Sequence, residues 1–312
     1  MLINNFLLPG VVIPLVCAAV ATAVAQWGRR GDTPVGGSLA VGAAFASAYV
    51  AMTGWPRFPP VESTQRLFYW VVVIGLIGFL WSRLKRDAPP WPIGVSAVAF
   101  LLWGMLKAPI ENTWTPATAA MWLGCLLIVG LVLTRTVEAS LKSAAGRPAL
   151  EAAAVRLAIV GGSAVALGLS GTARLAQLMG AVACGILVVE LLAWRLRRRP
   201  WLAGDALVLV TAVLGLLLGG YFYAELDTWP AALLIAALLL LGLGSGPGPL
   251  WRWLPLLPLI AALALVGWSF FHQEDDPYDY YGRRPAAGGE ASPLEAGNNE
   301  GNDEGNTPPR AA

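Results

Sequence analysis

The chain has 312 residues, of which 57% are apolar and 13% are charged, and its mean hydropathy is +0.63. A soluble domain of average composition carries about 25% charged residues, so this composition excludes a protein that water surrounds on every side. The chain also has one His and three Cys, which leaves few residues for a metal or haem site. We therefore assign no catalytic residues, metal or cofactor, and we expect a lipid bilayer, not a nucleic acid, as the partner.

Apolar runs follow one another along most of the chain. A helix that spans a bilayer needs about 20 mostly apolar residues, and eight runs satisfy this requirement well: 6–26, 37–54, 67–82, 117–134, 152–170, 175–194, 202–224 and 250–271. Two further runs, 91–106 and 230–245, are short, but Trp-Pro pairs at their starts are typical of interfacial helix starts. The sequence predicts an all-α integral membrane protein, a polytopic bundle of about ten transmembrane helices, with eight as the smallest count.

The placement of positive charge predicts how these spans are oriented. Lys and Arg in short loops collect on the cytoplasmic side of a membrane. With ten spans, one set of alternate loops holds 14 of these cations, and the other set holds four, namely Arg57, Arg66, Lys107 and Arg174. The N-terminus and the C-terminal tail are therefore predicted to lie outside the cytoplasm. Because 18 Arg stand against three Lys, as in GC-rich bacterial coding sequences, we expect a cell inner membrane and periplasmic ends.

The composition changes after the last apolar run and divides the chain into two parts. Residues 1–271 form the predicted multi-pass transmembrane domain, whereas residues 272–312 carry nine acidic and three basic residues with many Gly, Pro and Asn. Such a segment buries too little apolar surface to offset its ordering entropy, so we expect a disordered acidic tail. In the first part, residues 135–151 suggest a short interfacial helix capped by Thr136. Trp residues at the ends of the runs, Trp201 among them, suggest an aromatic belt at the membrane surface.

Glu190 and Asp205 are the first candidates for contact with an ion or a substrate, because charged residues inside apolar runs are costly. Both lie near the predicted cytoplasmic ends of their spans. The sequence favours stabilised end charges: Glu190 reaches Arg195 or Arg197 by extending toward the membrane surface, and Asp205 lies in the first turn of a helix, where the dipole favours an anion. The alternative is that both carboxylates line one cytoplasmic vestibule for a proton or another cation.

Four further candidates lie on the predicted outer side. Glu62 and Arg66 follow the proline-rich loop that begins at Trp55, and their spacing predicts an i,i+4 ion pair at the start of a helix. Glu225 and Asp227 lie in the short outer loop before residue 230. These four residues either stabilise helix ends or line an outer mouth that contacts a substrate or a partner.

Three classes of function fit the sequence. The first is a non-catalytic subunit or scaffold of an envelope assembly, which contacts other membrane subunits and needs only the features described above. The second is a secondary transporter of a small molecule, which explains the many spans and the prolines in the last one. The third is a membrane-embedded enzyme, but no set of acids, His or Ser is ordered by the sequence into a catalytic site. The first class is the sequence-based expectation.

Overall fold

The structure, a computed structural model, describes residues 3–26, 36–83, 91–143, 149–196, 201, 204–224, 226–243, 251 and 253–272. Met1–His272 form one compact unit. The predicted acidic tail lies outside the described residues except for His272, which is the last residue of α11, and Glu225 lies outside them too. The described residues contain helices and turns but no strand, which confirms the all-helical part of the prediction.

Ten α-helices occur in the described ranges, and a π-helix η1 (Ile3–Val12) precedes the first of them. The α-helices are α1 (Ile13–Gln26), α2 (Gly37–Thr53), α3 (Ser63–Arg83), α4 (Trp91–Asn112), α5 (Pro116–Ser143), α6 (Ala149–Leu169), α7 (Ala173–Leu196), α8 (Asp205–Tyr223), α9 (Thr228–Leu243) and α11 (Leu256–His272). In this part of the chain, seven helical segments are long and apolar enough to cross a membrane, and α2, α9 and α11 are shorter apolar helices.

Each predicted run overlaps a helical segment, but several boundaries differ from the sequence-based ones; α11, for example, begins at Leu256 and not at residue 250. The short run 91–106 is the start of α4, which continues to Asn112 and belongs to the seven long segments. The short interfacial helix predicted over 135–151 is wrong, because α5 continues without a break to Ser143. The Thr136 hydroxyl donates to the carbonyl oxygen of Leu133 at 3.0 Å, inside the helix, instead of capping a new one.

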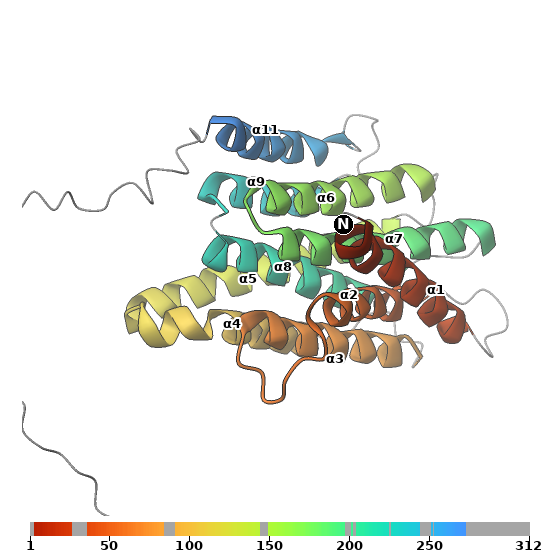
Figure 1. Ribbon diagram of the computed structural model, residues 1–312, viewed down its shortest axis with the longest axis horizontal. Coiled ribbons are helices and arrows are strands. Elements are labelled where there is room, and N and C mark those ends of the chain that lie inside the picture. Colours follow the sequence, from red (N-terminus) through yellow and green to blue (C-terminus); the bar gives the residue numbers. More distant parts are fainter. Residues whose placement is uncertain are drawn as a thin grey trace, which may run out of the picture. The chain divides into compact units, whose positions relative to one another are not determined.

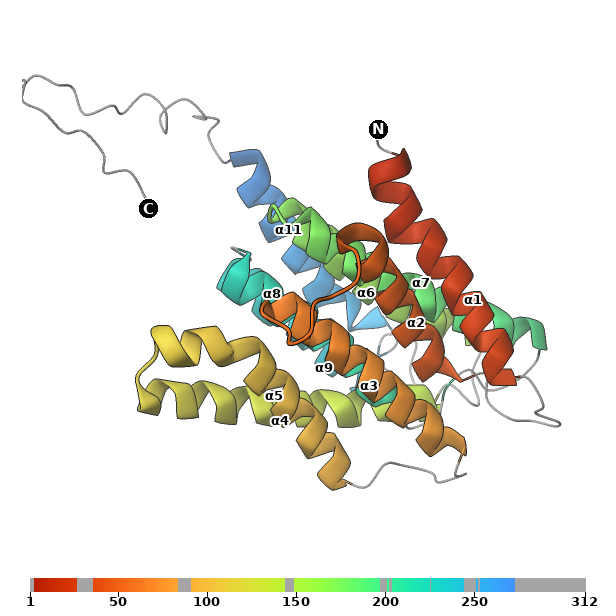
Figure 2. The same ribbon diagram turned by 60° about the horizontal axis from the view of Figure 1, so that its bottom comes forward.

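The helices lie side by side, and α8 lies at the centre of the bundle (Figures 1 and 2). Every residue of α8 from Asp205 to Gly220 is buried. The helix packs against α2, α3, α4, α5 and α7, so it contacts both the first and the second half of the chain. The hydrophobic core is built around it, and side chains at its two ends reach the ends of other helices.

Contacts near the helix ends indicate that α2, α4, α6 and α8 run in one direction, whereas α3 and α7 run in the other. At one end, which we call the inner end, Ser38 contacts Asp205 and Arg156 contacts Glu190. At the other, which we call the outer end, Arg66 contacts Gly104, Glu62 contacts Arg174 and Tyr223 contacts Met105.

Candidate functional site

Glu190 lies in the last third of α7 and is buried, with 6% of its surface exposed. Its Oε1 atom accepts hydrogen bonds from Arg156 of α6, at 3.1 Å from Nε and 2.5 Å from Nη2. The indole N–H of Trp201 donates to the same oxygen at 2.6 Å. The sequence-based partners were therefore wrong: Glu190 binds Arg156 inside the bundle, whereas Arg195 is exposed and Arg197 lies outside the described residues.

Arg156, the basic partner, is one of the 14 cations that the sequence-based topology assigned to the cytoplasmic loops. It lies in the second turn of α6, and only 3% of its surface is exposed. Its Nη1 atom is buried and has no hydrogen-bond partner among the described residues. Arg156 also lines a cavity of about 30 Å³ whose other lining residues are apolar and come from α5, α6, α7, α8 and α9. The guanidinium group thus has two sides, one bound to Glu190 and one without a protein acceptor.

Trp201 is a second residue whose role the sequence did not reveal. It was predicted to lie at the membrane surface as part of an aromatic belt, and the structure shows its ring buried inside the bundle, with 5% of its surface exposed. A Cβ atom on Gly37 would lie 2.2 Å from two carbons of the Trp201 ring. Position 37 therefore has to be glycine for the ring to occupy this place, where its N–H reaches Glu190.

Asp205 is completely buried at the start of α8, in the first turn, as the sequence predicted. Its Oδ1 atom accepts a hydrogen bond from the backbone N–H of Ser38 at 2.8 Å. Ser38 is in the first turn of α2, whose N-cap residue Gly36 has no side-chain hydrogen bond to supply. Because the first N–H groups of a helix need acceptors, the carboxylate of α8 acts as the missing cap of α2.

Glu190 and Asp205 belong to one polar cluster at the inner end, which we call the Arg156–Asp205 cluster: Ser38, Arg156, Glu190, Trp201 and Asp205. Gly37 connects its two parts, because its Cβ position lies against the Trp201 ring and 3.1 Å from Asp205 Oδ2. The cluster joins α2, α6, α7 and α8. Its chemistry is that of a buried, charge-paired joint, in which each carboxylate is bound by donors from other segments.

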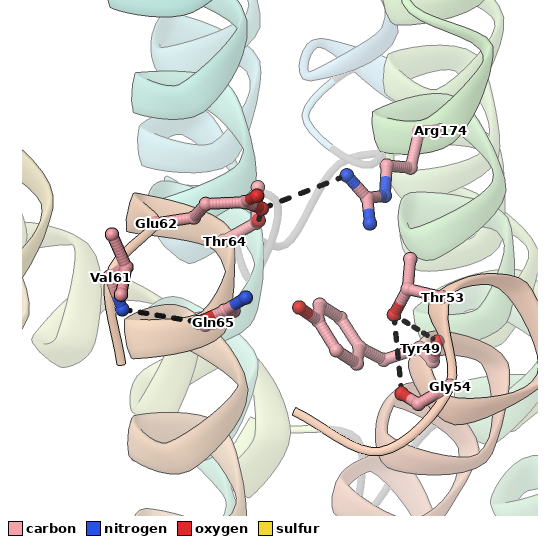
Figure 3. Close-up of polar contacts among 8 residues, drawn as sticks. All are labelled: Tyr49, Thr53, Gly54, Val61, Glu62, Thr64, Gln65 and Arg174. Carbon is pink, nitrogen blue, oxygen red and sulfur yellow. Dashed lines mark hydrogen bonds and ion pairs between the residues drawn. The ribbon is translucent and has the colours of Figure 1, made fainter. Parts of the chain in front are cut away.

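The outer candidates are arranged differently from the predicted i,i+4 pair. Glu62 Oε2 lies 4.0 Å from Arg174 Nη1 of α7 (Figure 3). The Arg66 guanidinium donates to the carbonyl oxygens of Gly104 at 3.1 Å and Val61 at 3.3 Å. The predicted Glu62–Arg66 pair is therefore wrong. Glu62 and Arg174 are both about half exposed, so their pair contributes little to stability.

Arg174 also lies near the aromatic ring of Tyr49. The guanidinium carbon of Arg174 is 6.0 Å from the centre of the Tyr49 ring, which is buried at the end of α2 (Figure 3).

Asp227, the last of the outer candidates, is exposed and directly precedes α9. Its backbone carbonyl accepts the N–H of Ala231 at 3.1 Å, in the first turn of α9. This hydrogen bond is the expected one for a residue that precedes a helix.

The described residues contain no group of three or more His, Cys, Asp or Glu side chains that could hold a metal ion. Comparison of the chain with protein-family models, with curated proteins and with solved structures found no match.

Proposed function

We propose that this chain is a multi-pass protein of a bacterial inner membrane, with ten spans and both ends in the periplasm, that serves as a non-catalytic subunit or scaffold of an envelope assembly. Seven long apolar helical segments and three shorter ones support the insertion. The opposite directions of neighbouring helices among α2, α3, α4, α6, α7 and α8 support crossings by these helices, including the short α2. The excess of Lys and Arg in the loops at the inner end supports the orientation.

The scaffold proposal rests on the hydrogen bonds that the two buried acids, Glu190 and Asp205, accept. Glu190 accepts three hydrogen bonds through one oxygen, and Asp205 accepts the backbone N–H of another helix. A carboxylate that binds and releases a transported ion has to exchange its partners during each cycle. Because these two carboxylates are bound by groups that hold four helices together, exchange would open the inner end of the bundle. The arrangement favours a permanent joint.

One observation favours the second candidate, a secondary transporter. Arg156 Nη1 has no acceptor among the described residues, and Arg156 lines a cavity of about 30 Å³. A site of that size holds about two water molecules, so a larger molecule does not fit unless the helices separate. A guanidinium beside an apolar cavity is nevertheless the type of group that binds a carboxylate or another anion.

A double variant, Arg156→Gln with Glu190→Gln, separates the two candidates. It removes both charges together and replaces them with two neutral amides, so no unpaired charge remains buried. Proton uptake is measured with a pH-sensitive dye inside vesicles that hold the full chain. If the chain is a scaffold, protons enter vesicles that hold the wild-type chain no faster than they enter empty vesicles. Wild-type uptake that the folded double variant loses would overturn the scaffold proposal in favour of transport.

The positive test of a scaffold is its assembly. We expect the tagged full chain, extracted from its native membrane in a mild detergent, to migrate in native gels well above its own mass of 32.9 kDa and to retain other membrane proteins after cross-linking. The double variant should retain the same proteins, because the cluster is internal. A wild-type chain that migrates alone and retains no membrane protein would contradict the proposal.

A further inference from the structure

The loop between α2 and α3, residues 54–62, exposes large apolar side chains at the outer end. We call it the outer loop. Trp55 is 77% exposed, Phe58 84% and Val61 74%. Exposed apolar residues that stand singly need no explanation, but three of them within seven residues of one loop expose an unusual amount of apolar surface to water. The outer loop therefore needs an apolar environment that the rest of the described structure does not supply.

Hydrogen bonds to the backbone hold the outer loop in this exposed conformation. The Tyr69 hydroxyl donates to the carbonyl oxygen of Pro56 at 3.2 Å and lies 3.4 Å from that of Arg57. The backbone N–H of Val61 donates to the side-chain oxygen of Gln65 at 3.1 Å. These bonds tie the loop to α3, so its apolar side chains are not free to fold back into the core.

Aromatic contacts fix the base of the same loop. The Phe58 ring packs edge-on against Tyr69, with 5.9 Å between ring centres, and Trp55 packs edge-on against Phe68 at 6.4 Å. Phe68 is buried and contacts Tyr49 of α2 at 4.9 Å. Since Trp55 is anchored on the buried Phe68 and Phe58 on the partly buried Tyr69, the outer faces of both rings are presented in a fixed arrangement.

The position of the outer loop in the bundle indicates which environment surrounds its exposed apolar side chains. Figure 1 shows the loop leaving the side of the bundle next to α3, near the ends of α2 and α3, instead of extending beyond those ends. In a protein that spans a membrane, this level is that of the lipid headgroups, where Trp and other amphipathic rings are favoured. Arg57, between the exposed rings, is itself exposed and forms no ion pair or side-chain hydrogen bond within the described structure.

We propose that the outer loop is a preformed anchor for the outer leaflet of the membrane. Trp55, Phe58 and Val61 enter the boundary between headgroups and acyl chains, and Arg57 binds a phospholipid phosphate, for which a guanidinium is well shaped. The anchor rests on the proposed membrane insertion. It holds the α2–α3 end at headgroup level, which fixes the depth of α2, one of the shorter helices.

Spin labelling of the full chain in nanodiscs tests the anchor. The three native Cys are replaced by Ser, and one Cys is introduced per variant. Phe58→Cys reports on the outer loop, Ile128→Cys, on an exposed part of α5, reports on insertion itself, and Thr113→Cys reports on the turn after α4. The nanodiscs contain phosphatidylcholine with phosphatidylglycerol, and the accessibility of each nitroxide to oxygen and to a water-soluble nickel complex is measured.

We expect the labels at 58 and 128 to be more accessible to oxygen than to nickel, and the label at 113 to show the reverse. A label at 58 that nickel reaches as readily as at 113, with 128 still in lipid, would overturn the anchor but leave insertion intact; the loop would then be free for a protein partner. A label at 128 that nickel reaches would contradict the insertion itself.

A second variant tests the role of Arg57. With the label at position 58, Arg57→Gln should raise the accessibility to nickel, and the rise should be larger in nanodiscs with phosphatidylglycerol than in phosphatidylcholine alone, because the lost contact is electrostatic. The matched change Lys107→Gln removes another partly exposed cation at the outer end, one whose ion pair with Glu111 lies within α4 and does not touch the loop, and should leave the label unchanged. Equal effects of the two changes would overturn the proposed phosphate contact.

Discussion

The hydroxyl of Tyr223, at the end of α8, donates a hydrogen bond to the carbonyl oxygen of Met105 in α4 at 2.5 Å. Within α4, Met105 would pair with the N–H four residues later, but that residue is Pro109, which has no N–H. Tyr223 thus supplies the donor that the proline removes. The sequence pattern ended this run at residue 106, whereas α4 continues through Pro109 to Asn112.

We predict that Tyr223→Phe lowers the free energy of unfolding by about 0.5–1.5 kcal/mol, the usual net contribution of one hydrogen bond. Unfolding is followed by titration with a denaturing detergent in mixed micelles. Tyr221→Phe is the matched control and should have no effect, because the Tyr221 hydroxyl forms no hydrogen bond within the described residues. Introducing Pro109→Ala restores an N–H for Met105, so the cost of Tyr223→Phe should then shrink. An unchanged cost would contradict this account.

Glu190→Gln should lower the free energy of unfolding by about 3–5 kcal/mol, because it leaves the Arg156 charge buried without a counter-charge. The sequence-based interpretation, a stabilised end charge near the membrane surface, implies a much smaller cost. The double variant Arg156→Gln with Glu190→Gln should recover most of the loss. The same detergent titration measures all three proteins, and a small cost for the single change would restore the sequence-based interpretation.

The stability cost of replacing Asp205 should depend on whether the new side chain still offers a hydrogen-bond acceptor to the backbone N–H of Ser38. Asn is as good a helix cap as Asp, so Asp205→Asn should retain the bond from the Ser38 N–H and cost little. Asp205→Ala removes the acceptor and should cost about 0.5–2 kcal/mol. Amide hydrogen exchange at Ser38 gives the direct readout. Equal exchange in the wild-type and Ala proteins would show that Asp205 does not cap α2.

Two glycines provide a matched pair for the packing of Trp201. Gly37→Ala places a Cβ 2.2 Å from the Trp201 ring, and we expect a cost of about 1–3 kcal/mol or more from overpacking. Gly124 in α5 has no atom within 4 Å of its Cβ position, so Gly124→Ala should stabilise the helix or leave it unchanged. Thermal unfolding of the detergent-solubilised proteins distinguishes the two, and a harmless Gly37→Ala would mean that the ring lies elsewhere.

The proposed orientation gives a direct prediction for reporter fusions. Fusions after Arg86 and after Arg199 should both report a cytoplasmic location, and a fusion after Gln273 should report a periplasmic one, because loop cations favour the cytoplasmic side. A cytoplasmic report at Gln273, with the other two unchanged, would show that the short run 230–245 does not cross the membrane.

The sequence by itself determined the helices and the order in which they follow one another. A run of about 20 apolar residues is a local property, and so is the cation content of a short loop. For this reason the runs match α1 to α11 closely, and the differences are confined to ends such as those of α4 and α5. The ion pair of Arg156 and Glu190 could also have been predicted from the sequence. The two residues carry opposite charges within two consecutive apolar runs, and charges inside spans tend to pair.

Only the tertiary structure decided which side chains meet. Arg156 and Glu190 are 34 residues apart, Met105 and Tyr223 are 118 apart, and Ser38 and Asp205 are 167 apart. Such pairs depend on the rotation of each helix about its axis and on its neighbours. An apolar run does not encode that rotation clearly, because lipid and the bundle interior are both apolar and favour the same side chains. Close packing around positions such as Gly37 sets the rotation, and packing exists only once the helices are together.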